Sequence, residues 1–366
     1  MSRESPGSGS TNETPASEAT IESCSSESQR LFDPADYLSF GTSTLVALAV
    51  YLLTLAPDIN LGFSGIFATA AMHGGVAHPP GYPLSTIYTW AFVKLVPISN
   101  VGWRVAAASA VAGATACGLI ALIVSRLGAR LLRADIDGGQ DARNLVQLRT
   151  AAAVCAALIF GFSGPFWGRA VIADVWTLSV LSLCLVFLLL LCWAQQPARR
   201  RCLYLAFFVY GLALTNSQLL LAVGPAIPFL LLTGSREIGR DAFICGTILC
   251  LAGLVAALSD AEPALEISRE GIQPVLTVYL STGLATTAMA VVLSIVTKQL
   301  LSEWRAALGC GAAFLAGLSL YLYVPLASMT NPPMNWGYPR TVQGFFHVLS
   351  RVSTNASTHR PTPFNS

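Results

Sequence analysis

The segment from Leu178 to Trp193 reads LSVLSLCLVFLLLLCW, and it decides the fold class. Between Asp174 and Arg199 there is no charged residue, so this run is long enough to cross the hydrocarbon core of a bilayer as one helix. Comparable apolar runs recur along the chain. The predicted spans lie near 38–55, 104–124, 150–166, 173–193, 203–216, 217–233, 242–258, 274–297 and 306–326. These runs predict an all-α, polytopic transmembrane bundle of about nine helices over residues 38–326.

Two of these runs are short. The fifth and sixth are separated only by the polar patch Thr215-Asn216-Ser217-Gln218, so they are either two spans or one kinked or re-entrant pair.

The composition excludes a soluble domain. The 366 residues include 21 basic and 19 acidic ones, 11% charged in all, against 54% hydrophobic, whereas a soluble domain is about 25% charged. The basic residues are scattered between apolar runs, so no nucleic-acid surface is predicted. Residues 1–37, rich in Ser, Thr, Glu and Pro, are expected to form a disordered cytoplasmic tail.

The distribution of basic residues predicts the orientation. Odd-numbered loops between the spans hold only Lys94, Arg104, Arg169 and Arg269. The even-numbered loops hold Arg126, Arg130, Arg133, Arg143, Arg149, Arg199, Arg200, Arg201, Arg236, Arg240, Lys298 and Arg305. Because basic loops stay in the cytoplasm, the N-terminus is predicted to be cytoplasmic. The protein would lie in a bacterial inner membrane or the endoplasmic reticulum, with the first loop (56–103) and the segment 327–366 on the outer face.

The long first outer loop is predicted to be structured. It contains Ala77-His78-Pro79-Pro80-Gly81-Tyr82-Pro83, in which prolines fix φ and the glycine permits a tight turn. Residues 84–96 are apolar but too short to span, which is typical of a helix lying along the membrane interface. The alternative is a rigid loop that only packs against the bundle.

Several motifs together resemble one family of multi-spanning proteins, long catalogued as a domain of unknown function, whose animal member is a protein O-mannosyltransferase of the endoplasmic reticulum. The motifs are, in order, Leu55-Ala56-Pro57-Asp58, Phe63-Ser64-Gly65-Ile66, His78-Pro79-Pro80-Gly81-Tyr82-Pro83-Leu84, Trp103-Arg104-Val105 with Ser109-Ala110, Ala173-Asp174-Val175-Trp176-Thr177-Leu178, Gly211-Leu212-Ala213-Leu214-Thr215-Asn216 and Asn331-Pro332-Pro333-Met334-Asn335-Trp336-Gly337. They cover roughly residues 40–350, and the His-Pro-Pro-Gly-Tyr-Pro box is the most specific.

The resemblance implies a GT-C-like glycosyltransferase fold whose first outer loop carries the catalytic acid. It also implies the partners: a hexose, mannose as the family suggests, carried on a polyprenyl phosphate, a protein or glycan acceptor, and the lipid bilayer. Such chemistry needs a general base for the acceptor hydroxyl and cations for the departing phosphate. The matched segments fall on the predicted outer face, where a lipid-linked donor would present its sugar phosphate.

Two departures from the family pattern support a different interpretation. The family usually has Asp-Ser-Gly-Glu where this chain has Phe63-Ser64-Gly65-Ile66, so both carboxylates are missing. The resemblance also ends after Arg351, whereas family members generally continue with more helices, which suggests a truncated chain or one with an altered end. The alternative function is therefore a membrane scaffold or lipid-binding relative that has lost the acidic pair.

The candidate catalytic residues are Asp58 and Asp174. Beyond the tail there are few acidic residues, and only these two stand beside matched outer segments. An acid at a membrane boundary is costly unless it is solvated or used. Asp58 is the predicted base, with solvation at a helix end as its alternative role. Asp174 is predicted to position acceptor or donor, with capping of the following helix as its alternative.

The other candidates are binding residues. Arg104 and Arg169 could hold the donor phosphate bidentately, or else snorkel to the interface, and the box supplies His78 and Tyr82 to the same site. The predicted acceptor or sugar contacts are Asn216, Asn335 and Trp336, with local hydrogen bonding or an aromatic belt as alternatives. The four histidines show no metal-ligand spacing, so neither a metal nor another cofactor is predicted.

Overall fold

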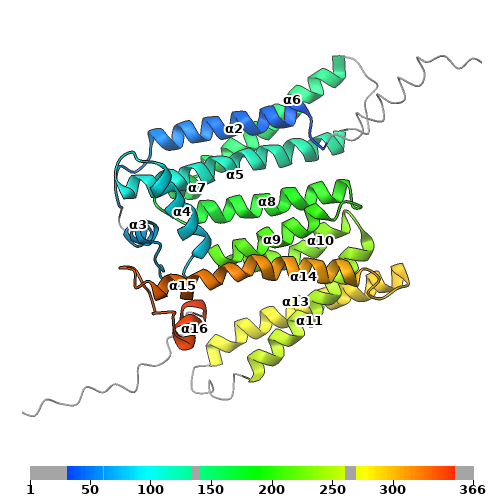
Figure 1. Ribbon diagram of the computed structural model, residues 1–366. Helices are drawn as coiled ribbons and strands as arrows, with labels where there is room; N and C mark the ends of the chain where they lie inside the picture. Colours follow the sequence, from blue (N-terminus) through cyan, green and yellow to red (C-terminus); the bar gives the residue numbers. More distant parts are fainter. Residues whose placement is uncertain (1–30, 61, 133–139, 260–268, 351–366) are drawn as a thin grey trace, which may run out of the picture.

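The computed structural model of the chain describes residues 31–60, 62–132, 140–259 and 269–350. Across these residues the predicted all-α bundle is confirmed (Figure 1). Seven helices in this part are long and apolar enough to cross a membrane. They are α2 (Pro34–Leu53), α5 (Val101–Leu132), α6 (Gln140–Gly161), α8 (Trp176–Gln195), α11 (Arg236–Ser259), α13 (Arg269–Thr297) and the broken helix formed by α14 (Trp304–Leu318), η3 (Ser319–Leu322) and α15 (Tyr323–Met329).

The two short predicted runs are separate elements. The first is α9 (Arg201–Asn216), and the second is the 3₁₀ segment η2 (Gln218–Ala226) followed by α10 (Ile227–Leu232). Both are apolar but shorter than the seven long helices. Pro225 lies inside η2 and lacks the N–H that a regular helix needs, which accounts for the irregular backbone.

Helix α2 begins at Pro34, so it includes the last residues of the segment 1–37 that was predicted to be a tail. Proline suits the first position of a helix, where an N–H would be unpaired anyway. The Asp36 carboxylate then accepts the backbone N–H of Asp33 at 2.9 Å, which satisfies a donor at the helix end. Residues 1–30 and 351–366 lie outside the described residues. Most of the predicted tail and the end of the predicted C-terminal segment fall in these two ranges.

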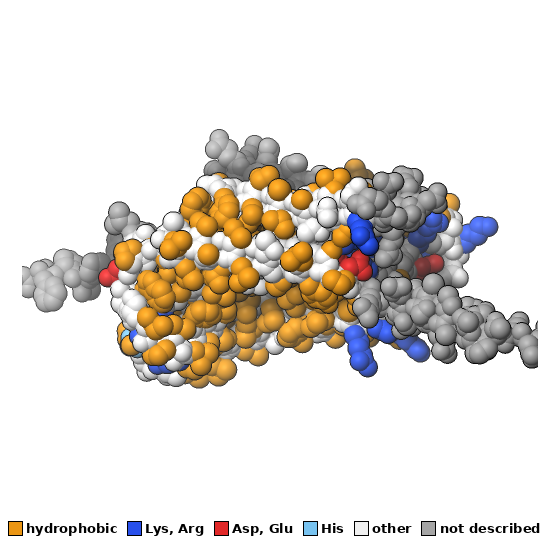
Figure 2. Space-filling model, turned by 90° about the horizontal axis from the view of Figure 1, so that it is seen from above, with side chains coloured by type: hydrophobic (Ala, Val, Ile, Leu, Met, Phe, Trp, Pro, Cys, Tyr) orange, Lys and Arg blue, Asp and Glu red, His pale blue; other side chains and the backbone are white. Residues whose placement is uncertain are grey.

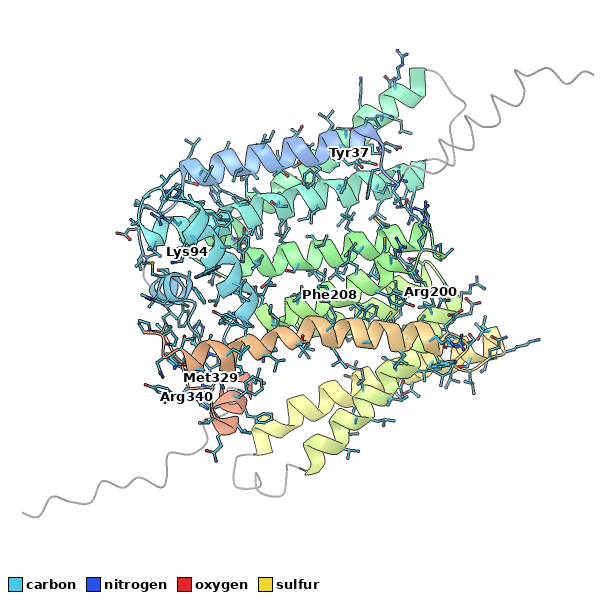
Figure 3. All side chains as sticks on the ribbon, viewed as in Figure 1. Tyr37, Lys94, Arg200, Phe208, Met329 and Arg340 are labelled. Atoms are coloured by element: carbon cyan, nitrogen blue, oxygen red, sulfur yellow. The ribbon has the colours of Figure 1, made fainter. Side chains whose placement is uncertain are left out.

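The bundle has two distinct ends. In Figure 3, Lys94, Met329 and Arg340 lie at one end, Tyr37 and Arg200 at the other, and Phe208 between them. An apolar surface runs between the ends in Figure 2. Large hydrophobic side chains on the long helices are exposed, such as Ile159 at 75% and Leu284 at 74%. A soluble protein rarely exposes so large an apolar patch, so this belt is the lipid-facing surface.

At the Arg200 end, charges are buried inside the bundle. Asp36, on α2, is fully buried and accepts a hydrogen bond from the Ser125 hydroxyl at 2.6 Å. Arg126 and Arg149, on α5 and α6, each lie within 4 Å of this carboxylate. Both arginines were expected in a solvated loop. The structure instead places them on helices, where their pairing with Asp36 fastens α2, α5 and α6 together.

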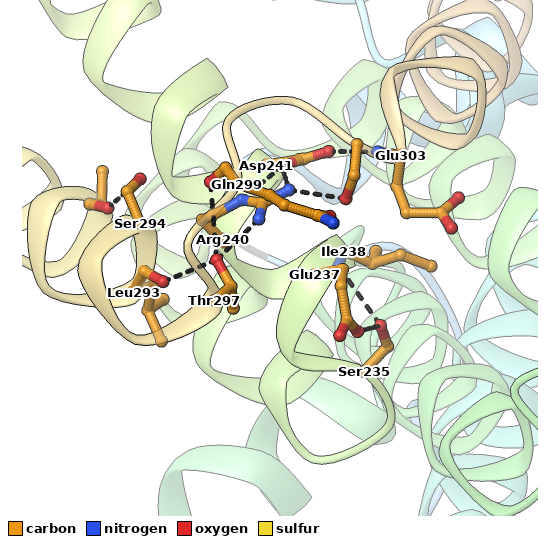
Figure 4. A network of polar contacts seen from close by, with 12 residues as sticks. Ser235, Glu237, Ile238, Arg240, Asp241, Leu293, Ser294, Thr297, Gln299 and Glu303 are labelled. Carbon is orange, nitrogen blue, oxygen red and sulfur yellow. Dashed lines mark hydrogen bonds and ion pairs between the residues drawn. The ribbon is translucent and has the colours of Figure 1, made fainter.

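A second buried network fastens the hairpin of α11 and α13 (Figure 4). The Arg240 guanidinium is fully buried and donates to Asp241, its neighbour on α11, and to the hydroxyls of Thr297 and Ser302. Asp241 in turn accepts the backbone N–H of Glu303 at 2.7 Å. A buried ion pair must have its remaining hydrogen bonds satisfied, and here the turn 297–303 supplies them.

Helices α9 and α14 pack backbone to backbone. A Cβ on Gly211 would lie 2.2 Å from the backbone oxygen of Phe314, and a Cβ on Gly317 would lie 2.1 Å from that of Phe208. Only glycine permits so close an approach. In a membrane, helices associate largely through such packing, so these two glycines fix the position of the broken helix.

We predict that Gly317→Ala lowers the free energy of unfolding in detergent by about 1–3 kcal/mol, because the new methyl group forces α9 and α14 apart. Gly311→Ala on the same helix is the matched control, since a Cβ there meets nothing within 4 Å. It should be neutral or slightly stabilising. Unfolding by titration with sodium dodecyl sulfate checks this, and equal stabilities of the two variants would contradict it.

The orientation stays a prediction with a direct measurement. Lys94 and Ala198 are exposed at opposite ends of the bundle. In a cysteine-free background, a membrane-impermeant thiol reagent should label Lys94→Cys from the outer side and Ala198→Cys only after permeabilisation, because the more basic loops remain cytoplasmic. The reverse pattern would show that the protein has the opposite orientation in the membrane. Labelling of both cysteines from the same side would contradict their placement at opposite ends of the bundle.

Candidate functional site at the outer-loop end

Short helices gather at the end opposite Arg200 (Figure 1). They are α3 (Ser64–His73), α4 (Pro83–Leu95), α7 (Gly164–Ala170) and α16 (Val342–Ser350), together with α15. The predicted helix over residues 84–96 is confirmed as α4. The Tyr88 hydroxyl on this helix donates to the carbonyl of Ala108 on α5 at 2.9 Å, and burial raises the pKa of Tyr88, so the hydroxyl stays a donor.

The first outer loop is joined to the C-terminal segment by backbone hydrogen bonds. The N–H of Val76 donates to the carbonyl of Met334 at 2.8 Å, and the N–H of Trp336 donates to the carbonyl of Val76 at 3.1 Å. The Tyr323 hydroxyl adds a bond of 2.7 Å to the carbonyl of Gly74. A Cβ on Gly75 would lie 2.4 Å from the Met334 oxygen, so glycine is required where the two segments meet.

The proline box then turns sharply. The N–H of Gly81 donates to the carbonyl of His78 at 2.9 Å. Gly81 has a φ of +88° and Tyr82 a φ of +47°, which is the left-handed region that glycine adopts without cost. A side chain on Gly81 would also press on Val324 and Val348. The turn directs both the His78 and the Tyr82 rings toward one aromatic group.

This group, the His78 cluster, comprises Phe63, Phe67, His78, Tyr82 and Trp336. The His78 ring stacks on Phe63 with centroids 4.4 Å apart and an interplanar angle of 20°. Tyr82 lies 5.1 Å away with its hydroxyl 3.4 Å from Nε2, and Trp336 meets the imidazole edge-on at 6.5 Å. Phe67 packs against both His78 and Tyr82. The structure therefore brings together three predicted site residues from segments more than 250 positions apart.

Asp58 lies on an exposed turn before α3. Its carboxylate accepts the N–H of Ile59 at 2.7 Å and lies beside Gly102, in the first turn of α5. The turn is held from the same helix end, because the Asn100 side chain donates to the carbonyl of Pro57 at 3.0 Å. Asp58 is thus fixed through the backbone around it while its side chain remains open to solvent.

Asp174 is in a different environment. Its side chain is 6% exposed and accepts a hydrogen bond of 2.6 Å from Arg169, whose side chain is 53% exposed. The other carboxylate oxygen accepts the N–H of Trp176, the first residue of α8 (Trp176–Gln195), at 2.9 Å. The Ser109 hydroxyl on α5 donates to the carbonyl of Asp174 at 3.0 Å and accepts the N–H of the same residue at 3.2 Å. These bonds fix the backbone just before α8.

The guanidinium of Arg104 is engaged by the protein itself. It donates to the carbonyls of Ile98 at 2.9 Å, Ser99 at 2.9 Å and Val93 at 3.1 Å. These bonds close the turn between α4 and α5. A phosphate at this residue would have to share the guanidinium with three backbone carbonyls.

The two predicted amide contacts differ in surroundings. Asn216 is fully buried and donates to the carbonyl of Val175 at 2.9 Å and to the Ser179 hydroxyl at 2.7 Å, so it belongs with Asp174 at the start of α8. Asn335 lies between Met334 and Trp336, beside the His78 cluster, and donates to the carbonyl of Ser328 at 3.3 Å. The described residues contain no group of three or more His, Cys, Asp or Glu arranged to hold a metal.

Sequence reasoning missed three participants. Phe63 drew attention only as a departure from the family pattern, yet it stacks on His78. Ser109 stands in a matched motif, but a lone serine gives no signal of its contact with Asp174. Arg340 donates to Asn331 at 2.7 Å and lies over the Tyr338 ring, an exposed cation that the spacing of motifs did not single out.

Comparison with known proteins finds relatives for part of this chain. Residues 64–238 match the family model of the protein O-mannosyl-transferase TMEM260 N-terminal domain. The protein O-mannosyl-transferase TMEM260 of Mus musculus is 30% identical over 213 residues, which cover 57% of this chain and 28% of that protein. The protein O-mannosyl-transferase tmem260 of Dictyostelium discoideum is 35% identical over 77 residues, 20% of this chain and 9% of that protein. The matches thus span at most about a quarter of the length of these relatives, and no solved structure matches.

The match to the family model begins at Ser64, the first residue of α3. It includes the His-Pro-Pro-Gly-Tyr-Pro box, Asp174 and Asn216. The comparisons confirm the resemblance seen in the motifs: over residues 64–238, the chain is similar to the N-terminal domain of the TMEM260 protein O-mannosyl-transferases.

Proposed function

We propose that this protein is a membrane glycosyltransferase. It moves a hexose, mannose by analogy with the names of its relatives, from a polyprenyl-phosphate donor to a hydroxyl group of a protein or glycan acceptor on the outer or lumenal face. The GT-C type of fold is part of this proposal. The observation that carries it is the His78 cluster, where the motif His78–Leu84 meets the motif Asn331–Gly337.

The composition of this cluster suits a sugar. Carbohydrates present apolar C–H faces and polar hydroxyl edges, and binding sites for them combine aromatic surfaces with a few directed polar groups. Trp336 is 44% exposed and offers such a surface. His78 and the Tyr82 hydroxyl offer hydrogen-bonding groups beside it. Asn335, next to Trp336 in the chain, adds an amide.

In the proposed reaction, the acceptor hydroxyl attacks the anomeric carbon of the donor sugar with inversion. The new C–O bond forms while the bond from the anomeric carbon to the phosphate oxygen breaks, and the phosphate leaves with that electron pair. The hydroxyl proton passes to a general base. Cations near the phosphate stabilise its charge as it departs.

Asp58 is better suited than Asp174 to be the base. Asp58 is exposed and keeps carboxylate oxygen lone pairs for an incoming hydroxyl. Asp174 is nearly buried, with one oxygen on Arg169 and the other on the Trp176 N–H. Both carboxylate oxygens of Asp174 are thus already engaged by the protein. We therefore assign Asp174 to positioning Arg169 and the start of α8, where Asn216 contributes as well.

The donor phosphate is assigned to Arg169 in preference to Arg104. Arg169 makes one ion pair and leaves about half of its side chain exposed, so it retains donors for a phosphate. The three carbonyls on Arg104 give that residue mainly a role in the turn between α4 and α5.

The alternative is a membrane scaffold or a lipid-binding protein without catalytic activity. It is favoured by one observation: Phe63 and Ile66 stand where the family usually has carboxylates, and the Phe63 ring occupies the face of His78. A scaffold of this kind would bind lipid without distinguishing phosphorylated from unphosphorylated polyprenol, and the two predictions below separate it from an enzyme.

We predict that Asp58→Asn reduces turnover by about 10²- to 10⁴-fold, because it removes the proton acceptor and changes little volume. Donor binding and expression should be nearly unchanged. Release of lipid phosphate from a mannosylated polyprenyl phosphate measures the rate. Glu237→Gln, at the opposite end of the bundle, is the control and should retain full activity. Wild-type turnover in Asp58→Asn would remove Asp58 from the mechanism and leave Asp174 to be tested in the same way.

We further predict that Arg169→Ala weakens binding of a polyprenyl phosphate by about 10- to 150-fold, which corresponds to one charge-assisted hydrogen bond of about 1.5–3 kcal/mol. Arg169→Lys should recover only part of the loss, because lysine lacks the planar fork. Binding of unphosphorylated polyprenol is the control and should not change. Affinities that are indifferent to the phosphate would support the scaffold.

A further inference from the structure

Phe63 and Phe67 are the members of the His78 cluster to which the proposed function gives no role, and Phe63 is the more exposed of the two. Phe63 precedes α3, and its carbonyl accepts the N–H of Phe67 at 3.1 Å, so its backbone belongs to the first helical turn. The loop before it is held by the Ser64 hydroxyl, which accepts the N–H of Asn60 at 2.9 Å. The backbone of Phe63 is therefore fixed on both sides, and the ring has a defined position.

The Phe63 ring is only partly covered by its neighbours. One face stacks on His78 at 4.4 Å, nearly parallel to the imidazole, yet the residue as a whole is 58% exposed. A phenylalanine whose role is core packing is normally buried, as Phe166 is in this chain at 8%. The exposed part of Phe63 lies at the same cluster as the exposed part of Trp336, with His78 in contact with both rings.

We propose that Phe63 is a ligand-contacting residue that determines sugar recognition, its exposed face packing on the C–H face of the donor's pyranose ring. Trp336 forms the second apolar surface, and His78 and Tyr82 provide hydrogen bonds to the sugar hydroxyls. This inference rests on the proposed function and deepens it. It gives an aromatic role to a position where related sequences usually carry a carboxylate.

A competing role is membrane anchoring, since exposed aromatic rings are common at the interface. The two roles differ in what they distinguish. A ring inserted among lipid headgroups contributes equally to the binding of any lipid phosphate. A ring packed on a pyranose contributes only when the sugar is present.

The test measures the affinity of the purified full chain, in lipid nanodiscs, for citronellyl phosphate and for its mannosyl derivative. The ratio of the two dissociation constants gives the contribution of the sugar. In the wild-type protein the mannosyl derivative should bind more tightly. Phe63→Leu should reduce that preference by about 2- to 12-fold, as expected for an aromatic contact of roughly 0.5–1.5 kcal/mol, while affinity for citronellyl phosphate stays the same. Phe63→Tyr should keep the preference.

Phe346→Leu is the matched control. Phe346 is 60% exposed at the same end of the bundle but packs on Phe345 instead of His78, so this variant should keep the wild-type preference. Should Phe63→Leu fail to fold, Phe63→Met keeps an apolar side chain and removes the ring face. The proposal is overturned if Phe63→Leu retains the wild-type preference, or if it weakens both ligands equally. A wild-type protein without any preference for the mannosyl derivative would instead overturn the proposed function, and this inference with it.

Discussion

The two backbone hydrogen bonds between Val76 and the segment Met334–Trp336 join the loop between α3 and α4 to the loop between α15 and α16. The His78 cluster depends on them, because His78 follows Val76 by two residues and Trp336 itself makes one of the bonds. Gly75 makes the contact possible, since any Cβ there would overlap the Met334 carbonyl. An unpaired backbone group buried at this interface would be costly, so the same bonds that satisfy the peptide groups also assemble the site.

How much could be predicted from the sequence differs between fold and site. The spans were predictable, because a bilayer demands a minimum apolar length and the chain supplies it without charges, as in the run from Leu178 to Trp193. Helix α2 begins four residues before the predicted first span. Pro34 and Asp36 are unfavourable inside an apolar helix but favourable at its N-terminus, so composition alone does not reveal this start. The proximity of His78 to Trp336 could not be predicted from the hydrophobic periodicity of the sequence, since it depends on a contact between segments that are far apart in the chain. The engagement of Arg104 by three carbonyls was equally invisible, because hydrogen bonds to backbone leave no pattern in side-chain types.

Charged residues in this protein divide into two kinds according to their surroundings. At the Arg200 end, Asp36 and Arg240 are fully buried and their partners lie on neighbouring helices or turns, so they hold helices in place. At the opposite end, Asp58 and Arg169 keep exposed surface. Removing one partner from a buried pair leaves an uncompensated charge and is strongly destabilising, whereas an exposed charge can be changed at little cost to the fold. Asp58 can therefore be changed at little cost to the fold, whereas Arg169→Ala also leaves the nearly buried Asp174 without its ion pair.

The close packing of Gly211 against Phe314 and of Gly317 against Phe208 has a consequence for biosynthesis. Helix α9 enters the membrane long before α14 is made, because the whole hairpin of α11 and α13 lies between them in the chain. Until then Gly211 has no contact with Phe314. The contacts of α2, α5 and α8, in contrast, join neighbours that are synthesised in quick succession. The amino-terminal part of the bundle can thus assemble as it is translated. The His78 cluster can form only after α14, α15 and the following Trp336 have been synthesised.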